Sequence, residues 1–201
     1  VDPRFLEAAQ DDATRLAILG YGEQAQTHLR ALRQVRPIDH VTVWGRSPER
    51  AGAFAAQMAT ETGLPVVAVG DVEGAVGEAD IICTVSGAEE PILKGAWVRP
   101  GTHLNLVGSS RPGPVEVDDD LVAASRFIAD SREGVLAQGA EFLNAKASGR
   151  VSDDHVVGEI GQVLSGAIAG RQSRDQITAY KSLGHIVQDL ASVQALFSSA
   201  M

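Results

Sequence analysis

Short apolar runs alternate with amphipathic stretches along most of the chain. Runs such as Leu16–Leu19 and Ile81–Val85 are almost continuously apolar, which indicates strands covered on both faces, as in a parallel sheet. Between such runs, apolar residues recur at helical spacing, as at Ala25, Leu29 and Leu32, and this predicts amphipathic helices. The pattern therefore predicts a protein in which strands and helices alternate.

The alternation predicts six strands separated by helices or turns. The expected strands are residues 16–19, 40–44, 65–69, 81–85, 103–107 and 127–129. The expected helices are residues 25–35, 48–62, 71–78, 118–124 and 131–138. This order predicts the α/β class, with a doubly wound, mostly parallel sheet of the Rossmann type.

The pattern changes after Gly139. We expect a loop as far as Val151, a helix over about His155–Ser165, a strand-like stretch over residues 176–180 and then a last helix. One face of that last helix carries Ile186, Leu190, Val193 and Phe197. The expected organisation is a linker over residues 1–13, a Rossmann domain over residues 14–145 and a C-terminal helical segment over residues 146–201.

A glycine-rich loop joins the first expected strand to the first expected helix. Residues 20–25 read Gly-Tyr-Gly-Glu-Gln-Ala, a GxGxxA pattern that directly follows an apolar strand. The first glycine permits the tight turn, the second lets backbone amides approach a pyrophosphate, and the third small residue allows close packing of helix on strand. The helix N-terminus supplies the anion site. We therefore expect a dinucleotide to bind at Gly20, Gly22, Glu23, Gln24 and Ala25.

The end of the second expected strand bears on which dinucleotide binds. An acid there would hold a ribose 2′-hydroxyl and repel a 2′-phosphate, but the strand continues into Gly45, Arg46 and Ser47, with Arg50 one turn later. A guanidinium and a hydroxyl suit a phosphate. Arg46, Ser47 and Arg50 are therefore expected to bind the phosphorylated ribose, and NADP(H) is preferred over NAD(H). The alternative is that both arginines are solvated charges.

Two further loops follow strands at the edge where ligands bind in open α/β sheets. The first contains Thr84, Val85 and Ser86, and the second contains Val107 and Gly108. We expect these loops to surround the nicotinamide and its ribose. The alternative is that their hydroxyls are ordinary polar turn residues.

Composition and charge exclude several classes of protein. Hydrophobic residues make up 44% and charged residues 21%, as in a soluble globular protein. The formal charge is −9 with no Lys/Arg-rich run, which argues against nucleic acid or an anionic membrane as a partner. The single cysteine, Cys83, is expected to pack within a strand, and the histidines lack metal-ligand spacing, so no metal site is expected. With no membrane-length apolar stretch and no leader pattern, the expected location is the cytoplasm.

Several segments together resemble the ornithine cyclodeaminase/mu-crystallin family. The resemblance runs from about Leu16 almost to the C-terminus, and the order and spacing of the segments make it specific. The segments are residues 18–25, 79–84, 91–95, 99–103, 107–112, 130–133, 181–184 and 188–190, together with Trp97.

The resemblance implies a homodimer in which a Rossmann domain presents NAD(P)(H) to an amino-acid or imino-acid substrate bound against an N-terminal domain. Family members reduce imines of amino acids, cyclise ornithine to proline with loss of ammonia, or interconvert an amino acid and an oxo acid. Ser182 would join the nicotinamide side, and Lys181 in the same loop would be either a contact or an exposed side chain. The segment 146–201 would return to the cofactor and dimer region.

This sequence departs from the cyclodeaminase pattern in two places. The cyclodeaminase branch carries a catalytic aspartate in the loop that aligns with residues 107–113, whereas this chain has Ser110 or Arg111 there. These two residues are the catalytic candidates, Arg111 as an anchor for a substrate carboxylate or else as a surface residue. Serine cannot act as the base that ornithine cyclisation needs. Reduction of an imine (ketimine) depends chiefly on the positioning of substrate and cofactor. Loss of the catalytic aspartate is therefore less damaging for a reductase.

The second departure is that the family's N-terminal domain is absent from these residues. Three functions follow as hypotheses. We favour an NAD(P)H-dependent reductase of amino-acid-derived imines, completed by residues outside this chain. The alternatives are NAD-dependent ornithine cyclodeaminase, and a cofactor-binding or dimerisation module without turnover.

Overall fold

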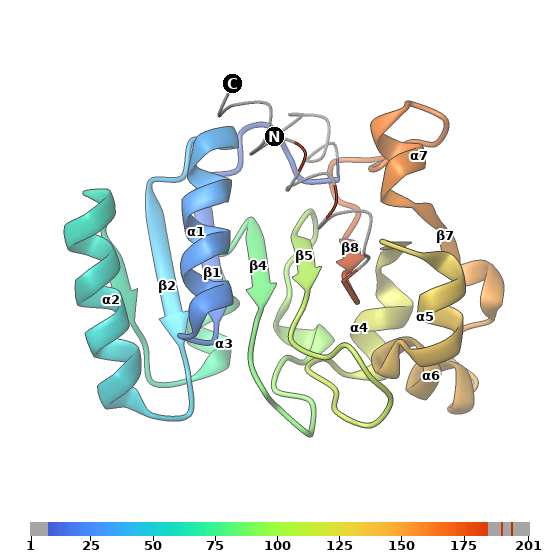
Figure 1. The fold of residues 1–201 in the computed structure, drawn as a ribbon, viewed down its shortest axis with the longest axis horizontal. Helices are drawn as coiled ribbons and strands as arrows, with labels where there is room; N and C mark the ends of the chain where they lie inside the picture. The colour runs from blue at the N-terminus through green and yellow to red at the C-terminus, as the bar shows by residue number, and fades with distance from the viewer. Residues whose placement is uncertain (1–7, 185–189, 191–193, 195–201) are drawn as a thin grey trace.

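The computed structural model describes residues 8–184 together with Leu190 and Gln194. Within these residues the chain forms one eight-stranded sheet, with the order β3-β2-β1-β4-β5-β8-β6-β7 (Figure 1). Every neighbouring pair is parallel. The strands are β1 Arg15–Leu19, β2 His40–Trp44, β3 Val66–Ala68, β4 Ile81–Thr84, β5 His103–Leu106, β6 Arg126–Ala129, β7 Val156–Glu159 and β8 Thr178–Lys181. The expected α/β class and doubly wound sheet are confirmed.

Helices connect the strands and cover both faces of the sheet (Figure 1). They are α1 Glu23–Val35, α2 Pro48–Thr62, α3 Val72–Val76, α4 Asp119–Ala124, α5 Arg132–Gln138, α6 Ala140–Ala147 and α7 Ile160–Leu164, with short 3-10 turns η2 Gly95–Trp97 and η3 Asp153–His155. Local sequence sets α2 clearly: the Ser47 hydroxyl accepts from the Arg50 amide, Pro48 opens the helix, and Gly63 ends it at a φ of 71°. No helix of the described residues is long and apolar enough to cross a membrane.

The sheet separates two apolar cores, which explains the continuous apolar runs. In β1, Leu16 and Ile18 belong to the core under α1 and α2, whereas Ala17 and Leu19 belong to the core under α3, α4 and α6. A strand that serves both cores has no polar face. Cys83 packs in the first core as expected, and burial raises the pKa of its thiol to about 12. It is a structural residue with no thiolate at neutral pH.

The second half of the chain differs from the expected helical segment. The expected loop over residues 139–151 contains α6, and the expected helix over 155–165 is divided into β7 and α7. Residues of β7 pair with β6 through a register shift, so a contact with a distant strand overrides the local helical pattern. β8 then returns from the end of the described chain to lie between β5 and β6. Residues 156–181 thus complete the same sheet, and the expected boundary at residue 145 falls inside α6.

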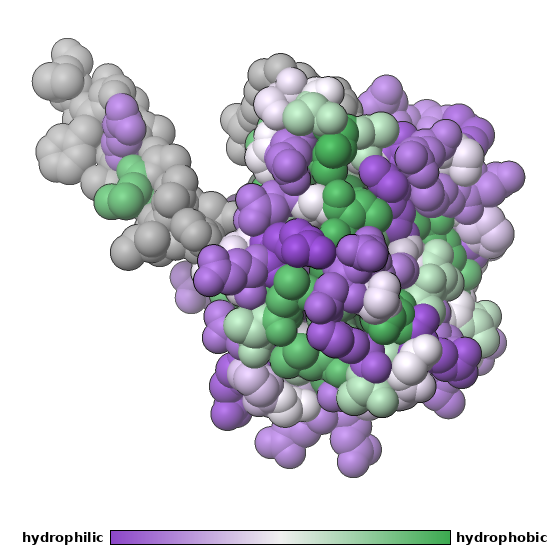
Figure 2. All heavy atoms as spheres, turned by 90° about the vertical axis from the view of Figure 1, so that its right-hand side faces the viewer, coloured by the Kyte–Doolittle hydropathy of each residue, from purple (hydrophilic) through white to green (hydrophobic). Residues whose placement is uncertain are grey.

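The N-terminal end of the described chain is tied to this sheet. Within the expected linker, Ala8 is buried and its carbonyl accepts from the Thr178 hydroxyl of β8 at 2.5 Å. At the sheet edge β7 leaves Val157 partly exposed, and Figure 2 shows hydrophobic residues among polar ones on that side of the molecule. The expected last helix lies outside the described residues except for Leu190 and Gln194, which are helical.

A buried ion pair explains why α6 sits against β8. The Lys181 ammonium lies 3.0 Å from the Glu141 carboxylate, and both side chains are fully buried. Lys181 also donates to the Ser109 carbonyl and hydroxyl, and that hydroxyl donates to Glu141. The charged Glu141 side chain therefore points inward, so apolar spacing alone did not show α6 within the expected loop. Lys181 itself lies in the strand and is neither exposed nor in a loop.

Removing one member of this pair is expected to destabilise the protein strongly. Lys181→Met leaves the Glu141 carboxylate buried without its cationic partner, and we expect the free energy of unfolding to fall by roughly 3–5 kcal/mol. The double variant Lys181→Met/Glu141→Gln removes both charges and should recover part of this loss. Urea denaturation followed by circular dichroism measures the change.

The matched control is Lys146→Met. The Lys146 ammonium pairs with Asp153 in a half-exposed site, so its loss should cost less than about 1 kcal/mol. Equal losses in the two single variants would show that the buried pair does not stabilise the packing of α6 on β8.

Candidate functional site

The glycine loop turns sharply between β1 and α1. Gly20 has a φ of 138°, and a Cβ atom on it would lie 2.6 Å from the Val85 carbonyl oxygen, so no other residue fits this turn. Gly22 is the N-cap of α1 and has no side chain to accept from the first-turn amides. A Cβ atom on Gly22 would meet nothing within 4 Å. The helix therefore begins in open space with amides available to an anion.

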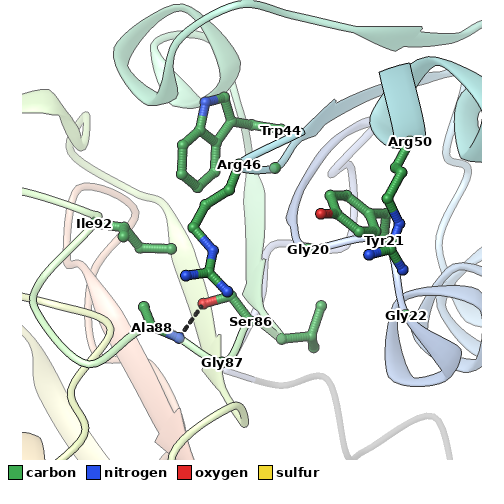
Figure 3. Close-up of a pocket in the computed structure, with 12 residues that line it drawn as sticks. Gly20, Tyr21, Gly22, Trp44, Arg46, Arg50, Ser86, Gly87, Ala88 and Ile92 are labelled. Carbon is green, nitrogen blue, oxygen red and sulfur yellow. Dashed lines mark hydrogen bonds between the residues drawn. The ribbon is translucent and has the colours of Figure 1, made fainter. Parts of the chain in front are cut away.

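A cavity of about 260 Å³ lies at this helix end, where β1 and β4 run side by side and the strand order reverses. Figure 3 shows its walls, which come from the glycine loop, the end of β2 and the loop after β4. The lining residues are Gly20, Tyr21, Gly22, Trp44, Gly45, Arg46, Arg50, Val85, Ser86, Gly87, Ala88 and Ile92. The cavity joins segments that are far apart in the sequence.

The structure brings only part of the expected cofactor site into this cavity. Six of the expected residues line it, namely Gly20, Gly22, Arg46, Arg50, Val85 and Ser86. Ala25 is fully buried and packs α1 on the sheet, while Glu23 and Gln24 lie exposed in the first turn. Ser47 caps α2 through the Arg50 amide at 3.3 Å. Val107, Gly108 and Ser182 follow β5 and β8, farther along the same sheet edge.

Two cations face the cavity in a chain of formal charge −9. Arg46 leaves the end of β2 and extends toward Ser86 (Figure 3). Arg50 stands on the first turn of α2, with its guanidinium 4.8 Å from the centre of the Tyr21 ring. Open helix amides and two guanidinium groups suit a ligand with separated anionic groups, so the residues present fit a dinucleotide.

A buried carboxylate holds the inner wall of the site together. Glu116 is fully buried, and its two oxygens accept four hydrogen bonds of 2.7 Å each. The donors are the Thr84 hydroxyl, the Ser86 amide, the Ser86 hydroxyl and the Gly108 amide. One carboxylate thus joins the loop after β4 to the loop after β5. Burial raises the pKa of Glu116, and the hydrogen bonds from Ser86 and Thr84 oppose that shift.

This carboxylate changes the roles expected for Thr84 and Ser86. Thr84 is fully buried, and its hydroxyl proton is used by Glu116. The Ser86 hydroxyl donates to Glu116 and accepts from the Ala88 amide at 3.2 Å, the bond drawn in Figure 3. Each hydroxyl has one proton, and each already donates it to Glu116. The wall they form therefore meets a ligand through Val85, Gly87 and the remaining lone pair of Ser86.

The loops after β5 and β8 are fixed by charged groups as well. The Ser109 carbonyl accepts from Lys181 at 2.5 Å, which anchors the residue just before the catalytic candidates. Asp130, at the end of β6, accepts from the amides of Leu183 and Gly184 at 2.6 and 2.8 Å, which fixes the loop that carries Ser182. Ser110 and Arg111 themselves are exposed. Among the described residues, no hydrogen bond or ion pair orients their side chains.

Sequence reasoning missed the groups that build the walls. Glu116 lies between Val115 and Val117, and all three are buried. A lone acid within an apolar pair was a usable sign of a buried carboxylate. Glu141 gave no such sign, since its partner Lys181 lies 40 residues away in sequence. Tyr21 and Gly45 contact one another only because β1 and β2 are neighbours.

Comparison with known sequences assigns the chain to one protein family. The profile of the Ornithine cyclodeaminase/mu-crystallin family matches residues 1–201. A Delta(1)-pyrroline-2-carboxylate reductase of Paracoccus denitrificans is 37% identical over 90% of this chain and 58% of its own length. The ketimine reductase mu-crystallin of Rattus norvegicus is 36% identical over 98% of this chain and 58% of its own length. The chain thus spans about three fifths of the length of these relatives.

A solved structure agrees with the sequence comparison. The Delta(1)-pyrroline-2-carboxylate reductase of Thermococcus litoralis, in complex with NADH and L-proline, matches with a TM-score of 0.89 and 31% identity. The match covers 98% of this chain and 63% of that one. The resemblance inferred from the sequence segments is confirmed.

The raised pKa of Glu116 predicts a pH dependence of stability. The folded state holds this proton more tightly than the unfolded state, where the pKa is about 4.5. The contribution of Glu116 to the free energy of unfolding therefore falls as the pH rises from 4.5 through the folded pKa. Glu116→Gln cannot titrate, so the stability of the wild type relative to this variant should decrease over that window, as measured by urea denaturation.

Glu61→Gln is a control of opposite sign. The exposed Glu61 pairs with Arg30, which lowers the pKa of that carboxyl below 4.5. Its small contribution to stability is present above pH 4.5 and is lost as the pH falls through the folded pKa. A wild-type profile parallel to that of Glu116→Gln would contradict the raised pKa of Glu116.

Proposed function

Because this chain belongs to the ornithine cyclodeaminase/mu-crystallin family, we propose that it binds NAD(P)H in the cavity at the N-terminus of α1 and provides the cofactor half of an imine reductase. The observation that carries the proposal is the cavity itself, in which a glycine turn, open helix amides and two arginines meet at the switch point of the sheet. When bound, the cofactor supplies the hydride for reduction of a C=N bond.

The protein's own groups serve to hold and orient the cofactor. The amides at the start of α1 bind the pyrophosphate. The loops that Glu116 and Asp130 hold in place lie beside the nicotinamide. Val107, Gly108 and Ser182 remain proposed contacts of the nicotinamide, and Arg111 remains a proposed anchor for a substrate carboxylate. The expected homodimer, the amino-acid or imino-acid substrate and the cytoplasmic location stay predictions.

Imine reduction agrees better with the loop after β5 than ornithine cyclisation does. Cyclisation needs a base near the substrate, and residues 108–113 of this loop include no carboxylate. The nearest carboxylate on the loop, Glu116, is buried and accepts four hydrogen bonds, so it is not free to take a substrate proton. Two of the similar proteins are named as reductases of pyrroline-2-carboxylate and of ketimines.

A preference for the phosphorylated cofactor is part of the proposal. The strand β2 ends at Trp44 without an acid, and Arg46 and Arg50 line the side of the cavity where a ribose 2′-phosphate would lie. The similar structure of Thermococcus litoralis contains NADH, so relatives bind the unphosphorylated cofactor as well. Affinity for the two cofactors therefore has to be compared directly.

We expect this chain to bind NADPH more tightly than NADH. Arg46→Ala should weaken NADPH binding by about tenfold or more, because it removes a charge-assisted hydrogen bond, and should change NADH binding little. Fluorescence titration of each reduced cofactor measures the dissociation constants. Arg33→Ala, on the exposed last turn of α1, is the matched control and should change neither constant. Equal affinities of the wild type for NADPH and NADH would contradict the proposed preference for the phosphorylated cofactor.

The reaction is tested on the full-length protein. We expect it to oxidise NADPH when given a cyclic imino acid such as pyrroline-2-carboxylate, and not to release ammonia from ornithine. The absorbance of the reduced cofactor and an ammonia assay follow the two reactions. Ammonia release from ornithine would favour the cyclodeaminase, and cofactor binding without either reaction would favour a module without turnover.

A further inference from the structure

The Tyr21 side chain fills the space between the glycine loop and the end of β2. Tyr21 is the residue between the two glycines of the loop, and its ring lies against the backbone of Gly45. A Cβ atom on Gly45 would lie 2.2 Å from Cε1 and 2.3 Å from Cδ1 of that ring. Gly45 is buried, so the ring cannot shift toward it. The ring and the glycine therefore fit only as a pair.

The same ring also contacts the guanidinium of Arg50. The Arg50 Cζ atom lies 4.8 Å from the ring centroid, within the range of a cation–π contact. Figure 3 shows the two side chains side by side above Gly22 and the start of α1. In the described part of the chain, Arg50 has no carboxylate within ion-pair distance, so its N–H groups remain available to a ligand. The Tyr21 ring thus holds the Arg50 guanidinium in place without occupying the N–H donors of that guanidinium.

The Arg46 guanidinium, in contrast, has no such support. Its side chain crosses the cavity toward Ser86 and Ala88 (Figure 3), and it lies in the space that a dinucleotide would occupy. No aromatic ring or carboxylate of the described residues holds its guanidinium. Arg46 must therefore rearrange when a ligand enters, whereas Arg50 is already placed. Preorganised donors contribute more to affinity than donors that must first be ordered.

We propose that Tyr21 is a specificity-determining residue, which acts by holding Arg50 at the end of β2 for the 2′-phosphate of NADP(H). The inference rests on the proposed function, since it requires a dinucleotide in this cavity. Tyr21 is a positioning residue for the phosphate and touches it only through Arg50. Gly45 belongs to the same device, because any side chain there would displace the ring.

The test compares the ratio of NADH to NADPH dissociation constants among variants of this chain. Tyr21→Leu removes the ring, and we expect the ratio to fall about two- to fivefold through weaker NADPH binding. Tyr21→Phe keeps the ring face and should leave the ratio unchanged. Gly45→Ala displaces the ring and should lower the ratio as Tyr21→Leu does. Arg50→Ala should lower it about tenfold or more.

A double variant separates this role from simple packing of the loop. If Tyr21 acts through Arg50, Tyr21→Leu/Arg50→Ala should show the ratio of Arg50→Ala alone. A packing role would weaken NADH and NADPH equally and leave the ratio unchanged, and that result overturns the proposal. The ratio needs no comparison of total stability, and NADH binding confirms that the loop is formed in each variant.

Failure of the inference is distinct from failure of the proposed function. If the wild type prefers NADPH and Arg50→Ala abolishes the preference, while Tyr21→Leu and Gly45→Ala keep it, the role of Tyr21 is refuted and the cofactor site stands. If the wild type binds neither cofactor, or binds both equally, the proposed cofactor site or its phosphate preference fails, and the inference fails with it.

Discussion

The candidate site depends on one carboxylate that has left water. A buried carboxylate is costly unless its lone pairs are filled, and Glu116 fills them with donors from two different loops. The Ser86 and Gly108 amides can only donate hydrogen bonds, so this arrangement requires a hydrogen-bond acceptor at the position of the Glu116 carboxylate. A Cβ atom on Gly108 would lie 2.4 Å from a Glu116 oxygen, which shows how closely the loop approaches. The positions of the walls follow from satisfying this group.

Electrostatics at the cavity run against the charge of the whole chain. The formal charge of −9 would repel an anionic cofactor at long range, but screening confines that effect to about 10 Å at moderate salt. Arg46, Arg50 and the first-turn amides of α1 act within the cavity itself. Local cations and dipoles therefore oppose the net charge at the cavity, although one exposed acid lies in the first turn of each flanking helix, Glu23 in α1 and Glu49 in α2.

The second half of the fold is organised by the late insertion of β8. This strand separates β5 from β6 and carries Lys181 into a fully buried pair with Glu141 of α6. The same ammonium holds the Ser109 carbonyl, and Asp130, which directly follows β6, holds the loop after β8. The loops at the substrate side of the sheet edge thus take their positions from charged groups behind them.

The sequence by itself determined the elements whose causes are local. Apolar runs predicted β1, β2, β4 and β5, the helical spacing of apolar residues predicted α1, and Gly20 and Gly22 predicted the tight turn between β1 and α1, because strand burial, amphipathic spacing and glycine geometry are read from neighbouring residues. Only the tertiary structure decided that residues 156–159 form a strand, that Glu141 and Lys181 are buried partners, and that Thr84 faces Glu116. Each of these depends on a group distant in sequence, whose contact repays the cost of an inward charge or overrides a local helical preference.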